Sequence, residues 1–324
     1  MNEVMETFAH GHTRLILGIP VRFESNAEEV MSAVARAYAD WPATDAEPRV
    51  WIRMLLAESA ADETTRLPIE FTFPAPDRVT FRTGHTLVDV DAGRRIALGR
   101  VTGAVLNDVE HFRYGLLEAA TLFVLTTLDR IPFHASALVQ GNRAVLLAGP
   151  SGVGKSSLAW AALRSDPTLQ MLAEDCVFIQ TQPESRIWGW PGFLHLSPDA
   201  AVFFEELRSR EASLLANGKW KIALEARNRT GGPEQSWTST ASVCLLRRDG
   251  GPPRLERLEP DEAGRRLFPA FEPGFDRFAD RLPAAVRPFL LPNAWQLDPG
   301  PDPRQAVQLL RDVLRLESEP QRAP

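Results

Sequence analysis

Residues 149–156 read Gly149-Pro150-Ser151-Gly152-Val153-Gly154-Lys155-Ser156 and satisfy the pattern GxxxxGK(S/T), which is typical of a phosphate-binding loop. An apolar run, 143–148, precedes the octapeptide, and a segment of helical composition, 158–163, follows it. The order strand, glycine-rich loop, helix is the context in which this pattern holds phosphate. A chance match in a chain of this composition is expected on the order of once in several hundred chains. An ordinary glycine-rich turn is therefore the weaker interpretation.

Each residue type in this loop has a physical reason to hold an anion. Glycines allow backbone N–H groups to point at phosphate oxygens, and the helix that begins near Lys155 adds the positive end of its dipole. Lys155 is expected to reach the β- and γ-phosphates, the Ser156 hydroxyl to bind Mg²⁺, and Ser157 to contact the α-phosphate. We therefore predict ATP and Mg²⁺ as cofactors.

The basic residues show a strong bias toward arginine. Of 36 lysines and arginines, only Lys155, Lys219 and Lys221 are lysine. A lysine that persists against such a bias is expected where a compact ammonium group is needed. On a strand, Lys219 and Lys221 would share one face and present two ammonium groups to a phosphate or an acidic substrate. Solvated surface charge is an equally good explanation for this pair.

An acidic pair, Glu174-Asp175, lies between two strand-like runs, 169–173 and 176–179. Two adjacent carboxylates would divide the labour that phosphoryl transfer needs, one binding Mg²⁺ and the other accepting a hydroxyl proton. A solvated acidic turn is the competing interpretation, because acidic turns are common. His134 precedes a hairpin predicted over 137–148, which would bring its imidazole beside the phosphates, although a lone histidine near a strand is more often structural.

The rest of the chain predicts two domains of α/β type. Residues 1–113 indicate a small α+β domain, with a helix over 27–39 and strands over 69–73, 79–81 and 86–90, and a contact with substrate or partner is its expected role. Residues 114–317 would form the catalytic domain and 318–324 a flexible tail. Within the catalytic domain we expect helices over 114–129 and 198–213, a strand over 242–246, a turn-rich loop over 228–239, and a last helix capped by Asp302.

Composition excludes several classes of protein. The chain has 324 residues, 44% of them hydrophobic, so wholly disordered and collagen-like proteins are excluded. A net charge of −6 argues against nucleic acid as the main partner. No signal peptide and no membrane span are indicated, and Cys176 and Cys244 have no metal-ligand spacing, so they are expected to be reduced core residues. A soluble cytoplasmic protein is expected.

The ordered set of His134, the loop 149–156 and Glu174-Asp175 resembles the catalytic domain of HPr kinase/phosphorylase, in which a histidine, a P-loop and an acidic pair occur in this order. Gly218-Lys219 and the C-terminal strand–helix layout resemble the HPr-kinase-related proteins encoded beside ribosomally made peptides, including lasso-peptide kinases. The resemblance covers residues 114–316, with strong motifs only from His134 to Asp175.

This resemblance implies a P-loop kinase domain related to phosphoenolpyruvate carboxykinase, with a mixed sheet, that transfers phosphate to a serine hydroxyl. By residue match, Lys155 and Ser156 would bind phosphate and Mg²⁺, and Asp175 would ligate the metal. Glu174 would be the base, and His134 would assist at the phosphates. Glu174 stands where those kinases carry Asp, and the glycine- and arginine-rich signature of the bifunctional enzymes has no counterpart. Phosphorylase activity and HPr as substrate are therefore not implied.

The leading hypothesis is an ATP- and Mg²⁺-dependent kinase acting on a hydroxyl, expected to be a serine of a peptide or protein. A small-molecule hydroxyl kinase is the second hypothesis. The third is a non-catalytic protein whose nucleotide state orders the 228–239 loop for a partner. The expected partners are a nucleotide and a hydroxyl-bearing substrate, and a homo-oligomer stays open. The predicted nucleotide-binding residues are Gly149, Pro150, Ser151, Gly152, Val153, Gly154, Lys155, Ser156, Ser157, Lys219 and Lys221.

Overall fold

A computed structural model describes residues 8–57, 67–190, 192–215, 219–225, 236–267, 280–290 and 294–316. The chain divides into two compact units, Met1–Arg130 and Ile131–Pro324. Both combine helices with mixed sheets, so the predicted α/β class is confirmed at this level. Within the described ranges, no helix is both long enough and apolar enough to cross a membrane.

The first unit is built on one sheet, in which the described residues form seven strands in the order β1-β2-β3-β7-β6-β5-β4. β2 with β3 and β3 with β7 are parallel, and the other neighbours are antiparallel. The strands predicted over 69–73, 79–81 and 86–90 are confirmed. The strand bounds are β1 His10–Ile16, β2 Ile19–Ser25, β3 Val50–Ala57, β4 Glu70–Ala75, β5 Arg78–Thr83, β6 Thr86–Asp91 and β7 Ile96–Thr102.

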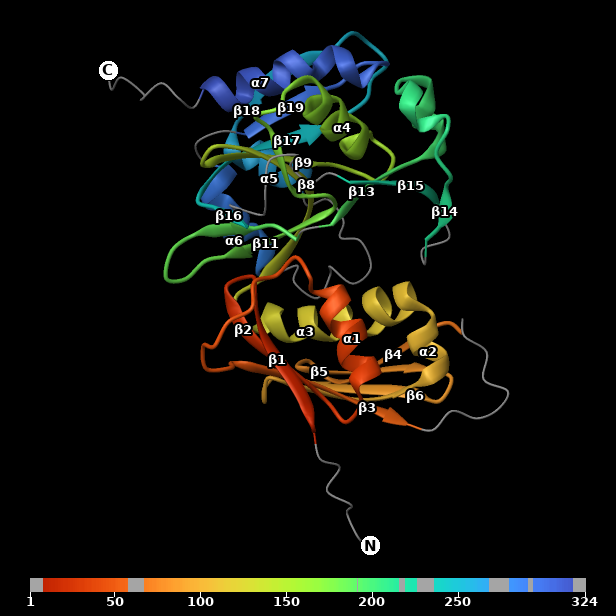
Figure 1. Cartoon of the computed structure of the whole chain (residues 1–324). Helices are drawn as coiled ribbons and strands as arrows, with labels where there is room; N and C mark the ends of the chain where they lie inside the picture. Colours follow the sequence, from red (N-terminus) through yellow and green to blue (C-terminus); the bar gives the residue numbers. More distant parts are fainter. Residues whose placement is uncertain are drawn as a thin grey trace, which may run out of the picture. The chain divides into compact units, whose positions relative to one another are not determined.

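The helices of the first unit lie over one face of this sheet (Figure 1). Buried Tyr38 follows α1, and its hydroxyl donates to Thr121 Oγ1 of α3 at 2.8 Å. Burial raises the pKa of Tyr38 well above its usual value, so the hydroxyl keeps the proton that it donates. The helices predicted over 27–39 and 114–129 are confirmed, the second beginning as a π-helical segment. The bounds are α1 Glu28–Ala37, α2 Gly103–Asn107, the π-helical segment His111–Glu118 and α3 Ala119–Thr127.

The boundary between the units differs from the predicted one. The sequence placed it between residues 113 and 114, whereas the contacts divide the chain between Arg130 and Ile131. The reason is that α3 packs on β3, β6 and β7 and so completes the core of the first unit. The predicted tail, 318–324, lies outside the described residues.

The second unit is built on a larger mixed sheet in the order β16-β12-β11-β8-β9-β17-β19-β18, with β10 also paired to β8. β17 is parallel to both β9 and β19, and the other pairs are antiparallel. The predicted hairpin is confirmed as β8 and β9. The bounds are β8 Ile131–Gln140, β9 Arg143–Ala148, β10 Gln170–Ala173, β11 Cys176–Gln180, β12 Arg186–Trp188, β16 Trp237–Thr238, β17 Thr240–Leu246, β18 Arg254–Leu258 and β19 Ala294–Asp298.

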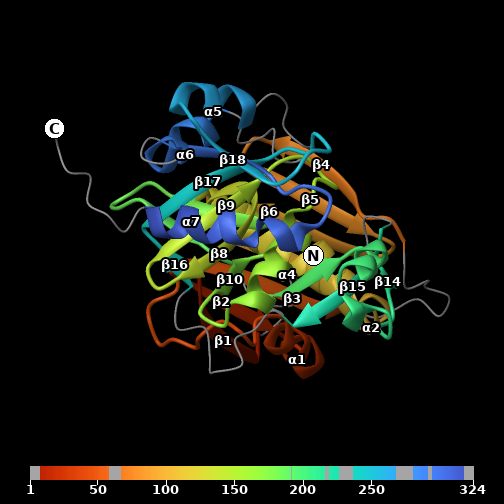
Figure 2. The same cartoon turned by 90° about the horizontal axis from the view of Figure 1, so that it is seen from above.

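Helices cover both faces of this sheet. Leu147 of β9 joins a buried cluster with Leu158 and Leu310, whereas its neighbour Leu146 joins the cluster that contains Val286. Alternate residues of one strand therefore pack into different layers, as a sheet buried on both sides requires. Figure 2 shows α5 and α6 on one side of β17 and β9, with α4 and α7 on the other. The bounds are α4 Lys155–Ser165, α5 Pro260–Leu267, α6 Leu282–Leu290 and α7 Val307–Leu316.

The prediction of a helix over 198–213 was wrong. Two short 3-10 helices, Pro198–Val202 and Glu205–Leu207, stand there instead. Phe204, between them, is buried with 5% of its surface exposed, so the chain turns inward at the point where a continuous helix would have kept its direction. A three-stranded sheet in the order β13-β15-β14 flanks this segment, with bounds β13 Phe193–Leu196, β14 Ser213–Leu214 and β15 Trp220–Glu225.

Candidate functional site

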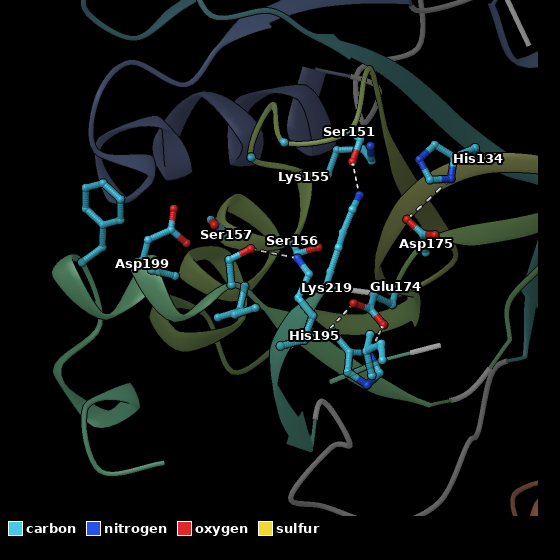
Figure 3. Close-up of a pocket in the computed structure, with 18 of the residues that line it drawn as sticks. His134, Ser151, Lys155, Ser156, Ser157, Glu174, Asp175, His195, Asp199 and Lys219 are labelled. Atoms are coloured by element: carbon cyan, nitrogen blue, oxygen red, sulfur yellow. Dashed lines mark hydrogen bonds and ion pairs between the residues drawn. The ribbon is translucent and has the colours of Figure 1, made fainter. Parts of the chain in front are cut away.

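A pocket of about 570 Å³ lies in the second unit, and nearly all of the predicted site residues line it (Figure 3). They include all three lysines of the chain, although lysine is rare in this sequence. The acidic pair and His134 lie on its wall as well. The predicted residues among its lining are His134, Ser151, Gly152, Gly154, Lys155, Ser156, Ser157, Glu174, Asp175, Lys219 and Lys221.

Strand pairing explains why segments far apart in the sequence meet here. Ala148, the last residue of β9, pairs with Ala135 of β8, so His134 lies on β8 close to the edge where β9 ends. β10 is antiparallel to β8 and ends at this edge, directly before Glu174. β17 is parallel to β9 and also ends there, shortly before Arg248. The connections after three strands therefore converge on one side of the pocket.

The glycine-rich loop joins β9 to α4. Gly154 has φ +107°, a left-handed conformation that favours glycine, and a Cβ there would lie 2.9 Å from Nη2 of Arg248. Lys155 is 7% exposed, and its Nζ donates to the carbonyl oxygens of Gly149 at 2.8 Å and Pro150 at 3.3 Å. The ammonium group therefore lies across the inside of the loop, between the backbone and the pocket.

Three predicted loop residues are absent from the described pocket wall. Gly149 and Pro150 contribute carbonyl oxygens to Lys155 instead. Val153 is 8% exposed and packs in the hydrophobic cluster that contains Leu158. These residues support the loop from behind, so only Ser151, Gly152, Gly154, Lys155 and Ser156 of the octapeptide line the pocket.

The other two lysines approach the pocket from the small sheet. Lys219 precedes β15, and its Nζ donates to Ser151 Oγ of the loop at 3.0 Å. Lys221 lies on β15, and its Nζ donates to Ser197 Oγ at 2.9 Å. Lys219 and Lys221 both line the pocket, although Lys219 precedes the strand on which the two were expected to lie. Gly218, the partner of Lys219 in the predicted motif, lies outside the described residues.

Glu174 is held by two donors from one residue. The backbone N–H of His195 donates to Oε1 at 2.6 Å, and Nδ1 of the same residue lies 2.6 Å from Oε2. Because carboxylate oxygens only accept, the ring nitrogen is the donor. Both side chains are 21% exposed. The carboxylate is thus fixed in orientation while one part of it stays open to the pocket.

Asp175 is the more open member of the acidic pair. Its side chain is 68% exposed, and Oδ1 lies 3.5 Å from Nδ1 of His134. Cys176 follows directly, and burial together with the charge of Asp175 raises the pKa of its thiol. The thiol therefore stays protonated and takes no part as a nucleophile. The other cysteine, Cys244, is buried.

Three further charged or titratable residues of the pocket were not predicted from the sequence alone, namely His195, Asp199 and Arg248. His195 lies on β13, Asp199 on the 3-10 helix Pro198–Val202, and Arg248 just after β17. None belongs to a motif, because each is brought in by tertiary packing. For Arg248 a signal existed, since residues that follow parallel strands meet at one sheet edge.

The charges of the pocket suit a polyanion that carries a metal ion. Among the described lining residues, Lys155, Lys219, Lys221 and Arg248 are cationic, and Glu174, Asp175 and Asp199 are acidic. The described ranges hold no cluster of three or more His, Cys, Asp or Glu side chains suited to a metal ion. Ser156 and Asp175 nevertheless supply a hydroxyl and a carboxylate oxygen. This donor set fits Mg²⁺, which prefers few protein oxygens together with phosphate and water.

Comparisons with known proteins give little beyond this geometry. No protein-family model matches the chain, and no curated protein matches it. Among solved structures, the HPr(Ser) kinase/phosphatase from Coxiella burnetii matches with a TM-score of 0.29 and 14% identity, over 58% of this chain and 99% of that chain. The function is therefore inferred from the pocket itself.

Proposed function

We propose that this protein is an ATP- and Mg²⁺-dependent kinase that transfers the γ-phosphate to a hydroxyl group, that of a serine in a peptide or protein. The observation that carries the proposal is the convergence in one pocket of the glycine-rich loop, the acidic pair and all three lysines. Phosphoryl transfer needs positioning and neutralisation of charge more than covalent chemistry. An anion-binding loop, three ammonium groups and a fixed carboxylate meet that need.

The reaction assigns a separate role to each group. The acceptor oxygen forms a bond to the γ-phosphorus, the bond from that phosphorus to the β,γ-bridging oxygen breaks, and ADP leaves with the electron pair. The hydroxyl proton passes to Glu174, whose orientation is set by His195. Lys155 and Lys219 lie at the loop, where charge on the phosphates is greatest. His134 would assist at the same phosphates, from beside Asp175.

The metal ion has two protein ligands in this proposal. Ser156 and Asp175 would hold Mg²⁺, which when bound neutralises charge on the β- and γ-phosphates. Asp175 suits this role better than the role of base, because its carboxylate is more exposed than that of Glu174. In this proposal the other site residues hold the phosphate donor and its metal ion, and Glu174 accepts the proton.

The test is transfer of label from γ-labelled ATP in the presence of Mg²⁺. Candidate acceptors are serine-containing peptides encoded near the gene, with sugars and hydroxyl amino acids as the second arm. Glu174→Gln should bind ATP as the parent does and lose transfer, because Gln keeps the shape but accepts no proton. Transfer to metabolites alone would favour the small-molecule kinase.

Two results would contradict the proposal. Near-parental transfer by Glu174→Gln would place the base elsewhere. Absence of transfer to every acceptor by a parent protein that binds ATP would favour a non-catalytic nucleotide-binding protein. The loop that this alternative invokes, 228–239, is described only from residue 236 onward.

A further inference from the structure

We propose that the end of the pocket lined by Asp199 and Phe203 is a nucleoside site, so that the phosphate donor is a nucleoside triphosphate and not an inorganic polyphosphate. This inference rests on the proposed function, because it assumes that the glycine-rich loop binds the phosphates. It adds two residues that belong to no phosphate-binding motif and that sequence analysis did not select.

The position of these residues follows from the direction of the phosphate chain. Figure 3 shows Ser157 and Asp199 at one end of the pocket and Asp175 and His134 at the other, with Ser156 between them. A donor whose terminal phosphate faces the acidic pair places its α-phosphate near Ser157. Whatever is attached to the α-phosphate then lies at the end that contains Asp199.

Phe203 gives this end an aromatic surface. It lines the pocket and is partly exposed, and its ring packs against buried Phe204 with the centroids 6.3 Å apart at an interplanar angle of 69°. Its backbone N–H donates to the carbonyl oxygen of Ala200 at 2.9 Å, which closes the 3-10 turn. The ring is thus supported from behind while part of it faces the pocket. Ala200, on the same 3-10 helix as Asp199, also lines the pocket.

An aromatic ring offers no favourable contact to a phosphate, but a flat heterocycle can stack on it. Stacking of a base on an aromatic side chain strengthens binding and tolerates different bases. A polyphosphate would leave this surface uncovered. Phe203 therefore gives the pocket an aromatic surface that the glycine-rich loop lacks.

Asp199 supplies a hydrogen-bond acceptor at the same end. It is exposed on the 3-10 helix Pro198–Val202, and its carboxylate makes no ion pair within the described part of the chain. Lys221 of β15, which also lines the pocket, donates to Ser197 Oγ at the start of this 3-10 helix. A carboxylate repels phosphate but accepts hydrogen bonds from neutral donors, and the ribose hydroxyls of a nucleotide are such donors. Asp199 is therefore assigned to the sugar and Phe203 to the base.

The experiment compares two probes by titration calorimetry, Mg-ATP and Mg-tripolyphosphate, which share the phosphate chain but not the nucleoside. We expect the parent protein to bind ATP at least tenfold more tightly. Phe203→Ala should weaken ATP binding about tenfold and leave tripolyphosphate binding unchanged. Asp199→Asn should act in the same direction with a smaller effect. Val202→Ala is the matched control, because Val202 is 71% exposed on the same 3-10 helix and does not line the pocket.

Each other outcome overturns the inference. Equal affinity of the parent for the two probes would show that the nucleoside makes no contact. If Phe203→Ala weakened the binding of ATP and of tripolyphosphate equally, the role of Phe203 would be structural. If Phe203→Ala does not fold, Phe203→Leu, which keeps an apolar side chain without the ring, replaces it in this test. Failure of the parent to bind either probe would contradict the phosphate-binding loop itself, and with it the proposed function.

Discussion

At the residue scale, Lys155 is closely confined by the glycine-rich loop. Its ammonium group is almost buried and makes two hydrogen bonds to loop carbonyl oxygens, at 2.8 and 3.3 Å. A guanidinium is wider and planar, so it does not fit the same place. The retention of lysine at this position is thus explained by space as well as by charge.

We predict that both Lys155→Ala and Lys155→Arg abolish nucleotide binding. Alanine removes the charge that faces the β- and γ-phosphates, and arginine keeps the charge but must displace the loop backbone. Titration with ATP measures the effect, with Arg164→Ala as the control. Arg164 lies on the same helix, but its side chain is 59% exposed and only pairs with Glu206 at the surface. Retention of parental affinity by Lys155→Arg would show that charge alone matters.

A second prediction concerns His195, which positions Glu174. His195→Ala removes the side-chain donor but leaves the backbone donor, so the carboxylate gains freedom to rotate. We expect the turnover number to fall about tenfold, a part of the 10²–10⁴-fold that a general base contributes, with KM for ATP unchanged. His195→Asn, whose amide replaces the Nδ1 donor, should restore most of the rate. Equal damage by both variants would argue for a purely structural role.

Whether a site residue could be predicted from the sequence depends on whether it belongs to a local pattern. Lys155 and Ser156 were selected by their spacing, and the structure places both on the pocket wall. His195, Asp199 and Arg248 were not selected, because each lies in a different segment and reaches the pocket only after the strands pair. Their roles are set by neighbours distant in the sequence, which spacing does not encode.

At the element scale, the 3-10 helix Pro303–Ala306, which leads directly into α7, shows how a local signal determines where a helix begins. Asp302 Oδ1 accepts a hydrogen bond from the backbone N–H of Arg304 at 2.9 Å, and Pro303 begins the first turn. The side chain of Arg304 donates to the same carboxylate. These hydrogen bonds, the side-chain one first, lower the pKa of Asp302, so the charged form is favoured in the folded state.

We predict that Asp302→Ala lowers the free energy of unfolding by about 1 kcal/mol, the usual effect of losing a helix cap. Because the pKa of Asp302 is lowered on folding, its contribution is present above the unfolded value of about 3.9 and is lost as pH falls through the folded value. The difference from the parent should therefore be constant from pH 5 to 8 and shrink below about pH 4. Urea unfolding measures it.

The control for this prediction is Gln305→Ala, an exposed position one residue further along the same turn. It should leave stability within about 0.5 kcal/mol of the parent. If Asp302→Ala lowered the free energy of unfolding by the same amount below pH 4, the ionised carboxylate would have no role in stability.

Elements that begin at a capping or turn residue were predicted correctly, whereas the structure of residues 198–213, which have no such signal, was not. The cap at Asp302 and the turn at 141–142 mark where a helix and a hairpin begin or turn, and both are found there. Residues 198–213 have helical composition, yet Phe204 is buried in an extended conformation, with φ −127° and ψ 99°, between two 3-10 turns. Tertiary packing outweighed propensity in this segment.

At the scale of the whole molecule, the sequence indicated two units but misplaced their boundary. The helix over 114–129 was recognised from its apolar spacing. Which core the helix completes depends on contacts with β3, β6 and β7, which lie earlier in the chain. Periodicity shows that a helix has a buried face, but it does not show what covers that face.

All described residues that line the pocket belong to the second unit. We therefore predict that a fragment comprising residues 131–324 binds ATP with the affinity of the full chain. Titration of the fragment measures this, and Lys155→Ala in the same fragment is the control for specific binding. A folded fragment that fails to bind ATP would show that the first unit contributes to the nucleotide site.

The same fragment tests the role expected for the first unit, contact with the substrate or a partner. If residues 1–130 hold the acceptor, the fragment should bind ATP normally but lose transfer to a peptide, and adding the first unit as a separate chain should restore part of it. Because acceptor and donor sites would then lie on different chains, the restored rate should rise with the concentration of the added unit and saturate. Full transfer by the fragment alone would show that the second unit recognises the acceptor unaided.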